Sequence, residues 1–336
     1  MSTWLKRLGI SVLLLASMLA ILYVFIRFQG IQYIAAYSGN GFARNLPASD
    51  AYPVQGQGGT ASCTTSQPIN VLTYNVLYGS TFIEDMAARF RNGDTGGYLP
   101  WSRRFPEIRQ RIASYAPDLI GLQETHTDTD IALIVPQDKY TLVTYHLGSF
   151  QYGDAALLFK TERFSLLESG QLWLGPNPEL PLALGFRPLA MIRYVNWAVL
   201  REQASGFTFL FANTHFDNSG ANKEPSSTLF HDRIANLARG MPIIVTGDFN
   251  STAKTARYRR FTGADQNPPL LRNAYTLANA PPVAAKVHPD SRIDHILVGG
   301  PCQVVADSWS IDQRPLENGQ AMSDHDPVLA SLRFMP

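Results

Sequence analysis

Residues 243–250 read Ile-Ile-Val-Thr-Gly-Asp-Phe-Asn, a run of β-branched residues that ends in a glycine, a carboxylate and an amide. Four consecutive β-branched side chains are typical of a buried strand, because they pack well on a pleated surface and are disfavoured in a helix. The carboxylate of Asp248 and the amide of Asn250 follow at the end of that strand. In open α/β folds, functional side chains collect at the ends of buried strands. The stretch therefore predicts a buried strand with a functional site at its carboxyl end.

Further apolar runs predict more strands from residue 69 onward. They cover 69–76, 119–122, 155–160, 194–200, 207–213, 243–246, 293–298 and 328–334. Phe105, Ile108, Ile112 and Tyr115 recur at helical spacing, which predicts an amphipathic helix over 102–115. A second helix is expected over 227–239. Many strands, few helices and long loops favour a layered α/β sandwich.

Polar side chains stand at the ends of most of these strands. One such residue alone has a simpler explanation, since Asp and Asn often only form turns, and a histidine beside a strand is usually a structural group. Their recurrence at strand ends favours a shared site. The candidates are Asn75, Glu124, His215, Asp248, Asn250, Asp294, Asp324 and His325.

The chemistry of this set points to a hard metal ion and a phosphate ester. Its carboxylates and amides supply oxygen ligands, which suit Mg²⁺ or Mn²⁺, with Ca²⁺ as a further candidate. The chain has no CxxC, no HExxH and no histidine cluster at zinc spacing. His215 and His325 can hold or move protons. This inventory serves metal-assisted attack of water on a phosphorus ester. A serine hydrolase is disfavoured, because no GxSxG motif is present.

Composition and charge narrow the classes of protein further. The 336 residues are 45% hydrophobic and 16% charged, which excludes a disordered chain. Residues 67–336 carry 24 basic and 26 acidic residues, so no basic excess indicates a nucleic-acid binder. Arg257, Arg259 and Arg260 form a short basic patch after the Gly-Asp-Phe-Asn stretch, for which a solvated loop is the alternative explanation.

The N-terminal region predicts a membrane anchor. Nineteen uncharged residues lie between Arg7 and Arg27, and as a helix they would span about 28 Å, close to the thickness of the hydrocarbon core. We expect residues 1–7 in the cytoplasm, a transmembrane helix over 8–28 and a Gly-, Ser- and Pro-rich tether over 29–68. The catalytic domain, 69–336, would then lie in the periplasm as part of a single-pass inner-membrane protein. A cleaved signal peptide is the alternative, with a small-x-small site at 36–38.

The two cysteines, Cys63 and Cys302, are the only ones in the chain. The predicted compartment is oxidising, so we expect them to form a disulfide. Two independent thiols are the alternative. A bridge would fix the end of the tether to the catalytic domain.

The motifs, taken in order, resemble the endonuclease/exonuclease/phosphatase superfamily. The resemblance rests on six segments over residues 69–336: Leu72-Thr-Tyr-Asn-Val76, Asp118-Leu-Ile-Gly-Leu-Gln-Glu124, Asn213-Thr-His-Phe-Asp217, Thr246-Gly-Asp-Phe-Asn250, Arg292-Ile-Asp-His295 and Ser323-Asp-His325. They are most similar to its metal-dependent hydrolase branch, with deoxyribonuclease-, sphingomyelinase- and deadenylase-like members. The resemblance implies a four-layer sandwich, in which two mixed sheets pack face to face with helices outside.

The resemblance also implies which residues hold the metal. Glu124 matches the principal Mg²⁺ ligand, and Asn75 stands beside it. Asp294 matches a further member of the site. Asp324 matches either the partner of His325 or a metal ligand.

Catalytic roles follow by the same resemblance. Asp248 matches the residue that positions or deprotonates the attacking water, and Asn250 matches the amide that orients the phosphate and the nucleophile. His325 matches the histidine that binds phosphate. His215 matches the histidine beside the leaving group, and Asp154 the acid that orients it.

The shared site implies a phosphoester substrate and little more, since members of the superfamily cleave DNA, RNA, sphingomyelin and inositol phosphates. An extracytoplasmic phosphodiesterase is the favoured function, acting on nucleic acid, phospholipid or a small phosphate ester. The alternative is a membrane-tethered binding protein on an inactive scaffold of the same fold. An inactive scaffold would be expected to have lost some of the candidate ligands.

Overall fold

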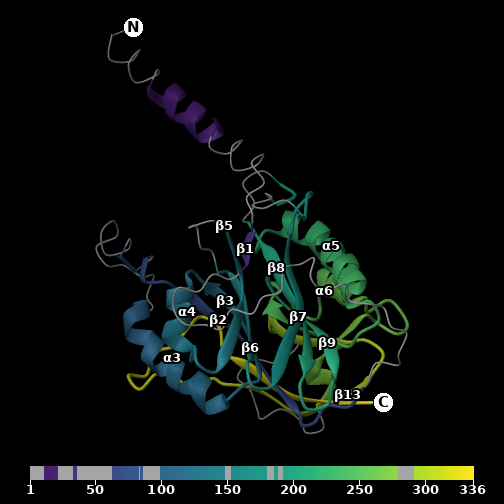
Figure 1. Ribbon diagram of the computed structural model, residues 1–336. Helices are drawn as coiled ribbons and strands as arrows, with labels where there is room; N and C mark the ends of the chain where they lie inside the picture. The colour runs from purple at the N-terminus through teal and green to yellow at the C-terminus, as the bar shows by residue number, and fades with distance from the viewer. Residues whose placement is uncertain are drawn as a thin grey trace.

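The computed structural model describes residues 11–21, 33–35, 63–82, 84–85, 99–147, 153–179, 185–187, 192–278 and 291–336. Its main body contains two six-stranded sheets, with strand orders β13-β14-β2-β3-β6-β4 and β11-β12-β10-β9-β8-β7 (Figure 1). The strands of the first sheet are β2 (Ile69–Gly79), β3 (Leu119–Thr125), β4 (Tyr140–Val143), β6 (Ala155–Lys160), β13 (Gln303–Ile311) and β14 (Val328–Met335). Those of the second are β7 (Phe164–Trp173), β8 (Tyr194–Glu202), β9 (Thr208–His215), β10 (Ile243–Asp248), β11 (Leu271–Asn273) and β12 (Asp294–Gly299).

Helices cover the outer face of each sheet, so the fold has four layers (Figure 1). Helices α3 (Trp101–Tyr115) and α4 (Asp128–Ile134) pack on the first sheet through apolar side chains such as Ile108 and Ile131. Helices α5 (Gly220–Ala238) and α6 (Ala256–Thr262) pack on the second sheet through Phe230 and Phe261. A 3₁₀ turn, η1 (Ala274–Leu277), follows β11. The predicted sandwich of two packed mixed sheets flanked by helices is confirmed.

Each sheet is mixed because it contains one parallel pair among antiparallel neighbours. β2 pairs with β3 in parallel, and β9 pairs with β10 in parallel. The carboxyl ends of two parallel strands lie at the same edge of a sheet, so these pairs bring the ends of four strands into one region. The strands and helices predicted from residue 69 onward are all present, whereas β4, β7, β11, β13, α4 and α6 were not anticipated. β7 was not predicted because its sequence, FSLLESGQLW, lacks a regular alternation of apolar and polar residues.

The two sheets meet at a core that includes a buried polar network. Apolar side chains from both sheets form one cluster, in which Val71 and Phe211 are almost fully buried. Gly121 allows the sheets to approach closely, because a Cβ at this position would lie 2.1 Å from Thr246 Oγ1. Asn213 accepts a hydrogen bond from Gln123 Nε2 at 2.7 Å and donates to two carbonyl oxygens of the first sheet. These bonds fix the sheets to each other directly beneath the strand ends.

The predicted disulfide between Cys63 and Cys302 is confirmed. It joins residues 239 apart in sequence and attaches the segment before β2 to the start of β13. Ser66 strengthens this attachment, since its backbone N–H and its hydroxyl both donate to the buried carboxylate of Glu202 at 2.7 Å. A cross-link over so long a loop typically stabilises a fold by roughly 2–4 kcal/mol. The end of the predicted tether is therefore part of the folded domain.

The rest of the N-terminal region is described only in part. Residues 11–21 form a helix. Within the predicted tether, β1 (Tyr33–Ala35) pairs antiparallel with β5 (Tyr145–Leu147), so this segment contains a strand that the composition did not predict. Among the described residues, no helix has the length and apolarity needed to span a bilayer. Residues 8–10 and 22–28 of the predicted transmembrane span, most of the predicted tether and all of residues 1–7 lie outside the described residues.

Candidate active site

The ends of the two parallel strand pairs bring the predicted site residues together. Asn75 and Glu124 come from β2 and β3, and His215 and Asp248 come from β9 and β10. Asp248 is in register with His215 on one side and with Asp294 of β12 on the other. All of these side chains except that of Glu124 are buried, and Glu124 is half-buried. The cluster therefore forms at one edge of the sandwich, from both sheets.

The side chain of Asn75 links the carboxylates of the two sheets. Its amide nitrogen donates to Glu124 Oε1 at 3.0 Å and to Asp248 Oδ2 at 3.2 Å. Its amide oxygen accepts from the backbone N–H of Leu77 at 3.0 Å. In this orientation Asn75 acts as a donor between two acids, rather than turning its oxygen toward Glu124. The predicted place beside Glu124 is what the structure shows, and the predicted role as a metal ligand stays a prediction.

A strained backbone segment holds Glu124. Glu124 itself has φ of 60°, and the facing residues Leu77 and Tyr78 have φ of 52° and 46°. Non-glycine residues rarely adopt this left-handed conformation, and where they do the strain is often found at functional sites. Tyr78 uses its backbone N–H to donate to Glu124 Oε2 at 3.1 Å. Both oxygens of Glu124 are thus oriented by single hydrogen bonds, which leaves each oxygen with a further lone pair.

Asp248 lies between two imidazole rings. His215 Nε2 is 3.4 Å from Asp248 Oδ2, and His325 Nε2 is 3.7 Å from the same oxygen. Burial raises the pKa of Asp248, and the neighbouring carboxylate of Asp294 raises it further, while the two histidines oppose this shift. A buried carboxylate with a raised pKa is suited to accept a proton from water.

His325 pairs with Asp294, the first residue of β12. Its Nδ1 lies 2.8 Å from Asp294 Oδ2. Burial alone would lower the pKa of His325, but the hydrogen bond and the charge of Asp294 outweigh it and raise the pKa to about 10. His325 is therefore a cation at neutral pH. The sequence suggested Asp324 as a partner of His325 or a metal ligand. The hydrogen-bond partner of His325 is Asp294 instead, while Asp324 is exposed and its carboxylate accepts from Ser323 Oγ.

Asn250 occupies a left-handed turn immediately after β10. Its φ is 47°, a conformation that Asn tolerates better than most residues because its short side chain can hydrogen-bond locally. Its backbone N–H donates to Asp248 Oδ1 at 2.8 Å, and its side-chain amide donates to the Phe216 carbonyl at 2.9 Å. Lys223, on α5, donates to the carbonyl of Asn250 at 2.7 Å. These contacts fix the turn that aims Asp248.

The predicted pairing of Asp154 and His215 is present, and it includes an arginine that sequence reasoning missed. Asp154 Oδ1 lies 2.9 Å from His215 Nδ1. Arg193, just before β8, donates to the other oxygen of Asp154. Burial would raise the pKa of Asp154, but His215 and Arg193 outweigh it and lower the pKa. Burial likewise disfavours the charged form of His215, but Asp154 raises its pKa overall.

A second missed residue, Arg104, supports the site from below. It is 2% exposed, and its guanidinium donates to the carbonyls of Val76, Leu77 and Met322 at 2.6 to 2.7 Å. It therefore ties the strained segment after Asn75 to the segment that precedes His325. The sequence could have indicated that Arg104 is buried, because it lies four residues before Ile108 and therefore on the apolar face of the helix.

The donor set fits a hard divalent cation. Among the described residues, ligand atoms of Asp248, Asp294 and His325 lie within 4.8 Å of one another. The hydrogen bond between His325 and Asp294 explains part of this closeness without an ion. Glu124 is not one of these three closely spaced ligands, but it shares Asn75 with Asp248, so its carboxylate belongs to the same edge. Carboxylate oxygens without any thiolate are the ligands that Mg²⁺ and Mn²⁺ prefer.

Two other histidines near the site have structural surroundings. His295 is 2% exposed and donates from Nε2 to the Ser251 carbonyl, while its Nδ1 faces the amide of Asn273. Burial lowers the pKa of His295 to about 4, so the ring is neutral. His126 lies 3.0 Å from the Ser80 hydroxyl through Nδ1, and its ring meets Phe82 edge-on.

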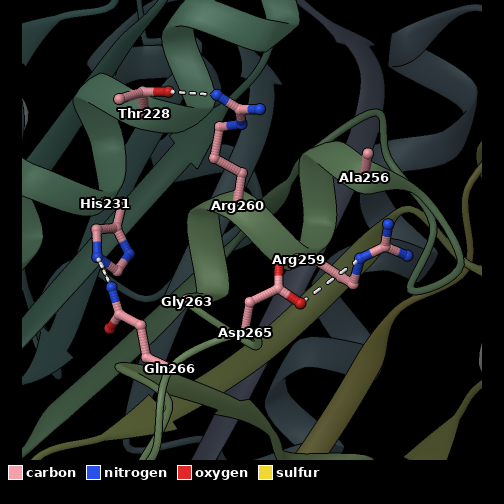
Figure 2. A pocket seen from close by; sticks show the side chains of 8 residues that line it. All are labelled: Thr228, His231, Ala256, Arg259, Arg260, Gly263, Asp265 and Gln266. Atoms are coloured by element: carbon pink, nitrogen blue, oxygen red, sulfur yellow. Dashed lines mark hydrogen bonds and ion pairs between the residues drawn. The ribbon is translucent and has the colours of Figure 1, made fainter.

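The basic patch lies away from the catalytic cluster. Arg259 and Arg260 stand on α6, so the patch is helical rather than a loop, and they line a pocket of about 380 Å³ between α5 and α6 (Figure 2). Arg259 lies 3.9 Å from Asp265, and Arg260 approaches Thr228 at 3.5 Å. None of the candidate site residues lines this pocket.

Comparison with known proteins identifies the family. The model of the "Endonuclease/Exonuclease/phosphatase family" matches residues 72–325, which is most of the chain and includes all six of the segments that carry the resemblance. The chain belongs to this family. Its members are phosphoester hydrolases, so the family accounts for a site of acids, amides and histidines at the strand ends.

Individual family members share the fold at low sequence identity. A family protein from Bacteroides thetaiotaomicron has a TM-score of 0.65 and 23% identity, covering 80% of this chain and 100% of its own. A mannosyl-6-phosphatase from the same organism has a TM-score of 0.62 and 22% identity, covering 79% and 100%. The catalytic domain of human nocturnin with bound sulfate has a TM-score of 0.58 and 21% identity, covering 81% and 96%.

One curated relative is similar over part of its length. The mouse protein angel homolog 2 is 27% identical over 201 residues, which is 56% of this chain. The match spans 36% of that protein.

Proposed function

We propose that this protein is a divalent-metal-dependent phosphoesterase that hydrolyses a phosphate ester by attack of water. The observation that carries the proposal is the position of Asp248, between His215 and His325 and joined to Glu124 through Asn75. A water-activating acid, two histidines and a metal-binding acid are the groups that this reaction needs. Membership of a family of phosphoester hydrolases supports it.

Each residue near Asp248 has a distinct role in the proposed reaction. Asp248 accepts a proton as the water oxygen attacks phosphorus. The cationic ring of His325 donates to a phosphate oxygen, and Asn250 holds the turn that aims Asp248. The bond from phosphorus to the leaving oxygen then breaks, and its electron pair takes a proton from His215 Nε2. His215 is suited to this step, because Asp154 raises its pKa.

Mg²⁺ or Mn²⁺ is the metal that we propose for the site, with Ca²⁺ as a weaker candidate. Glu124 would hold it, with Asp294 as a further oxygen donor, and it would supply charge neutralisation at the phosphate. Asp324, which is exposed, and Asn75, which donates, are the less suited of the four predicted ligands.

The substrate that we propose is a phosphodiester, of nucleic acid, phospholipid or a small phosphate ester. The absence of a basic excess and the predicted anchor support a lipid or small ester over a nucleic acid. The mannosyl-6-phosphatase among the similar structures makes a phosphomonoester the second candidate. An inactive scaffold is disfavoured, because all of the catalytic groups are present and hydrogen-bonded to one another.

A panel of esters tests the proposal on the full-length chain. Bis-p-nitrophenyl phosphate, p-nitrophenyl phosphate, DNA, RNA, sphingomyelin and inositol phosphates would be offered with Mg²⁺ or Mn²⁺. We expect turnover that chelation with EDTA abolishes.

Glu124→Gln should lose most activity at limiting metal and regain part of it at excess metal, because a neutral amide binds the cation more weakly than a carboxylate. No turnover by the wild-type chain, or wild-type activity of the variant at limiting Mg²⁺, would contradict the proposal.

We also propose that the catalytic domain faces the periplasm on a single inner-membrane anchor. The uncharged run 8–26 behind Lys6 and Arg7 supports the anchor, and the disulfide supports an oxidising compartment. Protease added to cells with a permeabilised outer layer should digest the domain, which should fractionate with membranes beforehand. Full protection by an intact inner membrane would contradict the orientation, and recovery in the soluble fraction would favour a cleaved signal peptide.

A further inference from the structure

We propose that Arg193 is a positioning residue that fixes Asp154, and through it His215, for protonation of the leaving group. This inference rests on the proposed phosphoesterase function and goes beyond it. Arg193 belongs to none of the sequence motifs that carry the family resemblance, and it lies 22 residues before His215 in the chain.

The contacts of Asp154 place it between two cationic partners. Its Oδ1 faces His215 Nδ1 at 2.9 Å, and its Oδ2 accepts from Nη1 of Arg193. The three residues are 3 to 8% exposed, so water does not compete for these bonds. With each oxygen occupied by a different partner, the carboxylate cannot rotate without breaking a buried hydrogen bond. Such a loss would leave a buried polar group without a partner, which is unfavourable.

Asp154, and not Arg193 directly, decides that Nδ1 of the ring carries a proton. Arg193 Nη1 also lies 2.9 Å from His215 Nδ1. Guanidinium N–H groups are only donors and a carboxylate is only an acceptor, so the Nδ1 proton bonds to Asp154, and Arg193 acts on the ring through that carboxylate. When Nδ1 carries a proton it donates to Asp154, and Nε2 then points toward Asp248, 3.4 Å away. The ring is therefore held with Nε2 toward the reacting side of the site.

A permanent cation is needed here because His215 changes charge during the proposed reaction. After His215 has given its Nε2 proton to the leaving oxygen, the ring is neutral and no longer balances Asp154. A buried carboxylate without a partner is strongly unfavourable. The guanidinium of Arg193 stays charged at any physiological pH, so Asp154 remains ionised and continues to hold the Nδ1 proton in place.

The three residues also join the two sheets at the catalytic edge. Asp154 precedes β6 of the first sheet, while Arg193 precedes β8 and His215 ends β9, both of the second sheet. At the opposite ends of the strands, Arg163 makes a similar contact across the sheets. It donates to Asp118 Oδ2 at 2.6 Å and to Glu202 Oε1 at 2.7 Å. Arg163 provides a matched control, because it is an ion-paired arginine that lies far from the site.

The test compares two esters of the same phosphate that differ only in leaving group. The p-nitrophenyl ester leaves readily without a proton, whereas the phenyl ester needs one. Arg193→Met in the full-length protein should lower kcat for the phenyl ester by roughly 10²-fold, the lower end of what general acid catalysis contributes. The loss for the p-nitrophenyl ester should be less than about tenfold, with KM little changed for both. Arg193→Lys should recover part of the loss, and Arg163→Met should lower stability without any dependence on the leaving group.

Other outcomes overturn the inference. Equal losses for the two esters with a raised KM would mean that Arg193 binds the phosphate itself, and unchanged kinetics would mean that it is structural. If Arg193→Met does not fold, Asp154→Asn must show the same leaving-group dependence, and a uniform effect would again refute it. A wild-type chain that hydrolyses neither ester, nor anything in the panel, contradicts the proposed function itself.

Discussion

Asp248→Asn is expected to lower phosphoesterase turnover by roughly 10²–10⁴-fold, the contribution usual for a positioned acid or base. The asparagine keeps the size and shape of the side chain but cannot accept a proton from water. It also presents an N–H where both oxygens now accept hydrogen bonds, from Asn75 and Asn250. Excess Mg²⁺ should not restore activity, since the missing function is proton transfer rather than metal affinity.

A matched variant separates this effect from a loss of folding. Asp118 is also a buried carboxylate, but it pairs with Lys160 and Arg163 at the opposite ends of the strands. Asp118→Asn should lower the melting temperature and leave turnover per folded molecule close to that of the wild type. Turnover of Asp248→Asn within tenfold of the wild type, or its rescue by metal, would show that Asp248 does not handle the proton.

His325→Ala is expected to lower turnover by roughly 10²–10³-fold, the usual cost of removing one donor aimed at developing charge. Asp294 raises the pKa of His325 to about 10, so the variant removes a full positive charge at neutral pH. It also leaves Asp294 beside Asp248 without a cation between them. Steady-state kinetics beside thermal melts would measure the effect.

His231→Ala provides the control, since that histidine lies on α5 beside the surface pocket and away from the cluster (Figure 2). It should retain wild-type turnover. Asp294→Asn should reproduce part of the His325 effect, because it removes the partner that keeps the ring charged. Equal activity of His325→Ala and the wild type would refute the assignment of this histidine to the phosphate.

Local patterns were sufficient to predict the central strands. The run that ends in Asp248 is rich in β-branched residues and is almost fully buried, so the composition of the segment correctly predicted a buried strand. The outer strands β4, β11 and β13 were missed, because short strands and partly exposed edges carry a weaker pattern. Helix α5 begins at Gly220, seven residues before the predicted start, since the prediction placed the helix after Pro225 while the structure includes that proline near its first turns.

The sequence by itself determined the chemical groups of the site and the strand ends on which they stand. It also predicted the disulfide, because only two cysteines exist and the predicted anchor would place them in an oxidising compartment, and the structure contains this disulfide. These inferences succeed because hydrophobic periodicity and cysteine number are properties of the chain that do not depend on distant contacts.

Only the tertiary structure decided which groups pair. His325 pairs with Asp294, 31 residues away, and not with the adjacent Asp324, because consecutive side chains leave the backbone in different directions while the start of β12 brings Asp294 to face the ring. The same holds for Arg193, whose guanidinium reaches Asp154 across the two sheets. Hydrogen bonds between sheets depend on how the layers pack, and no local pattern in the sequence encodes that packing.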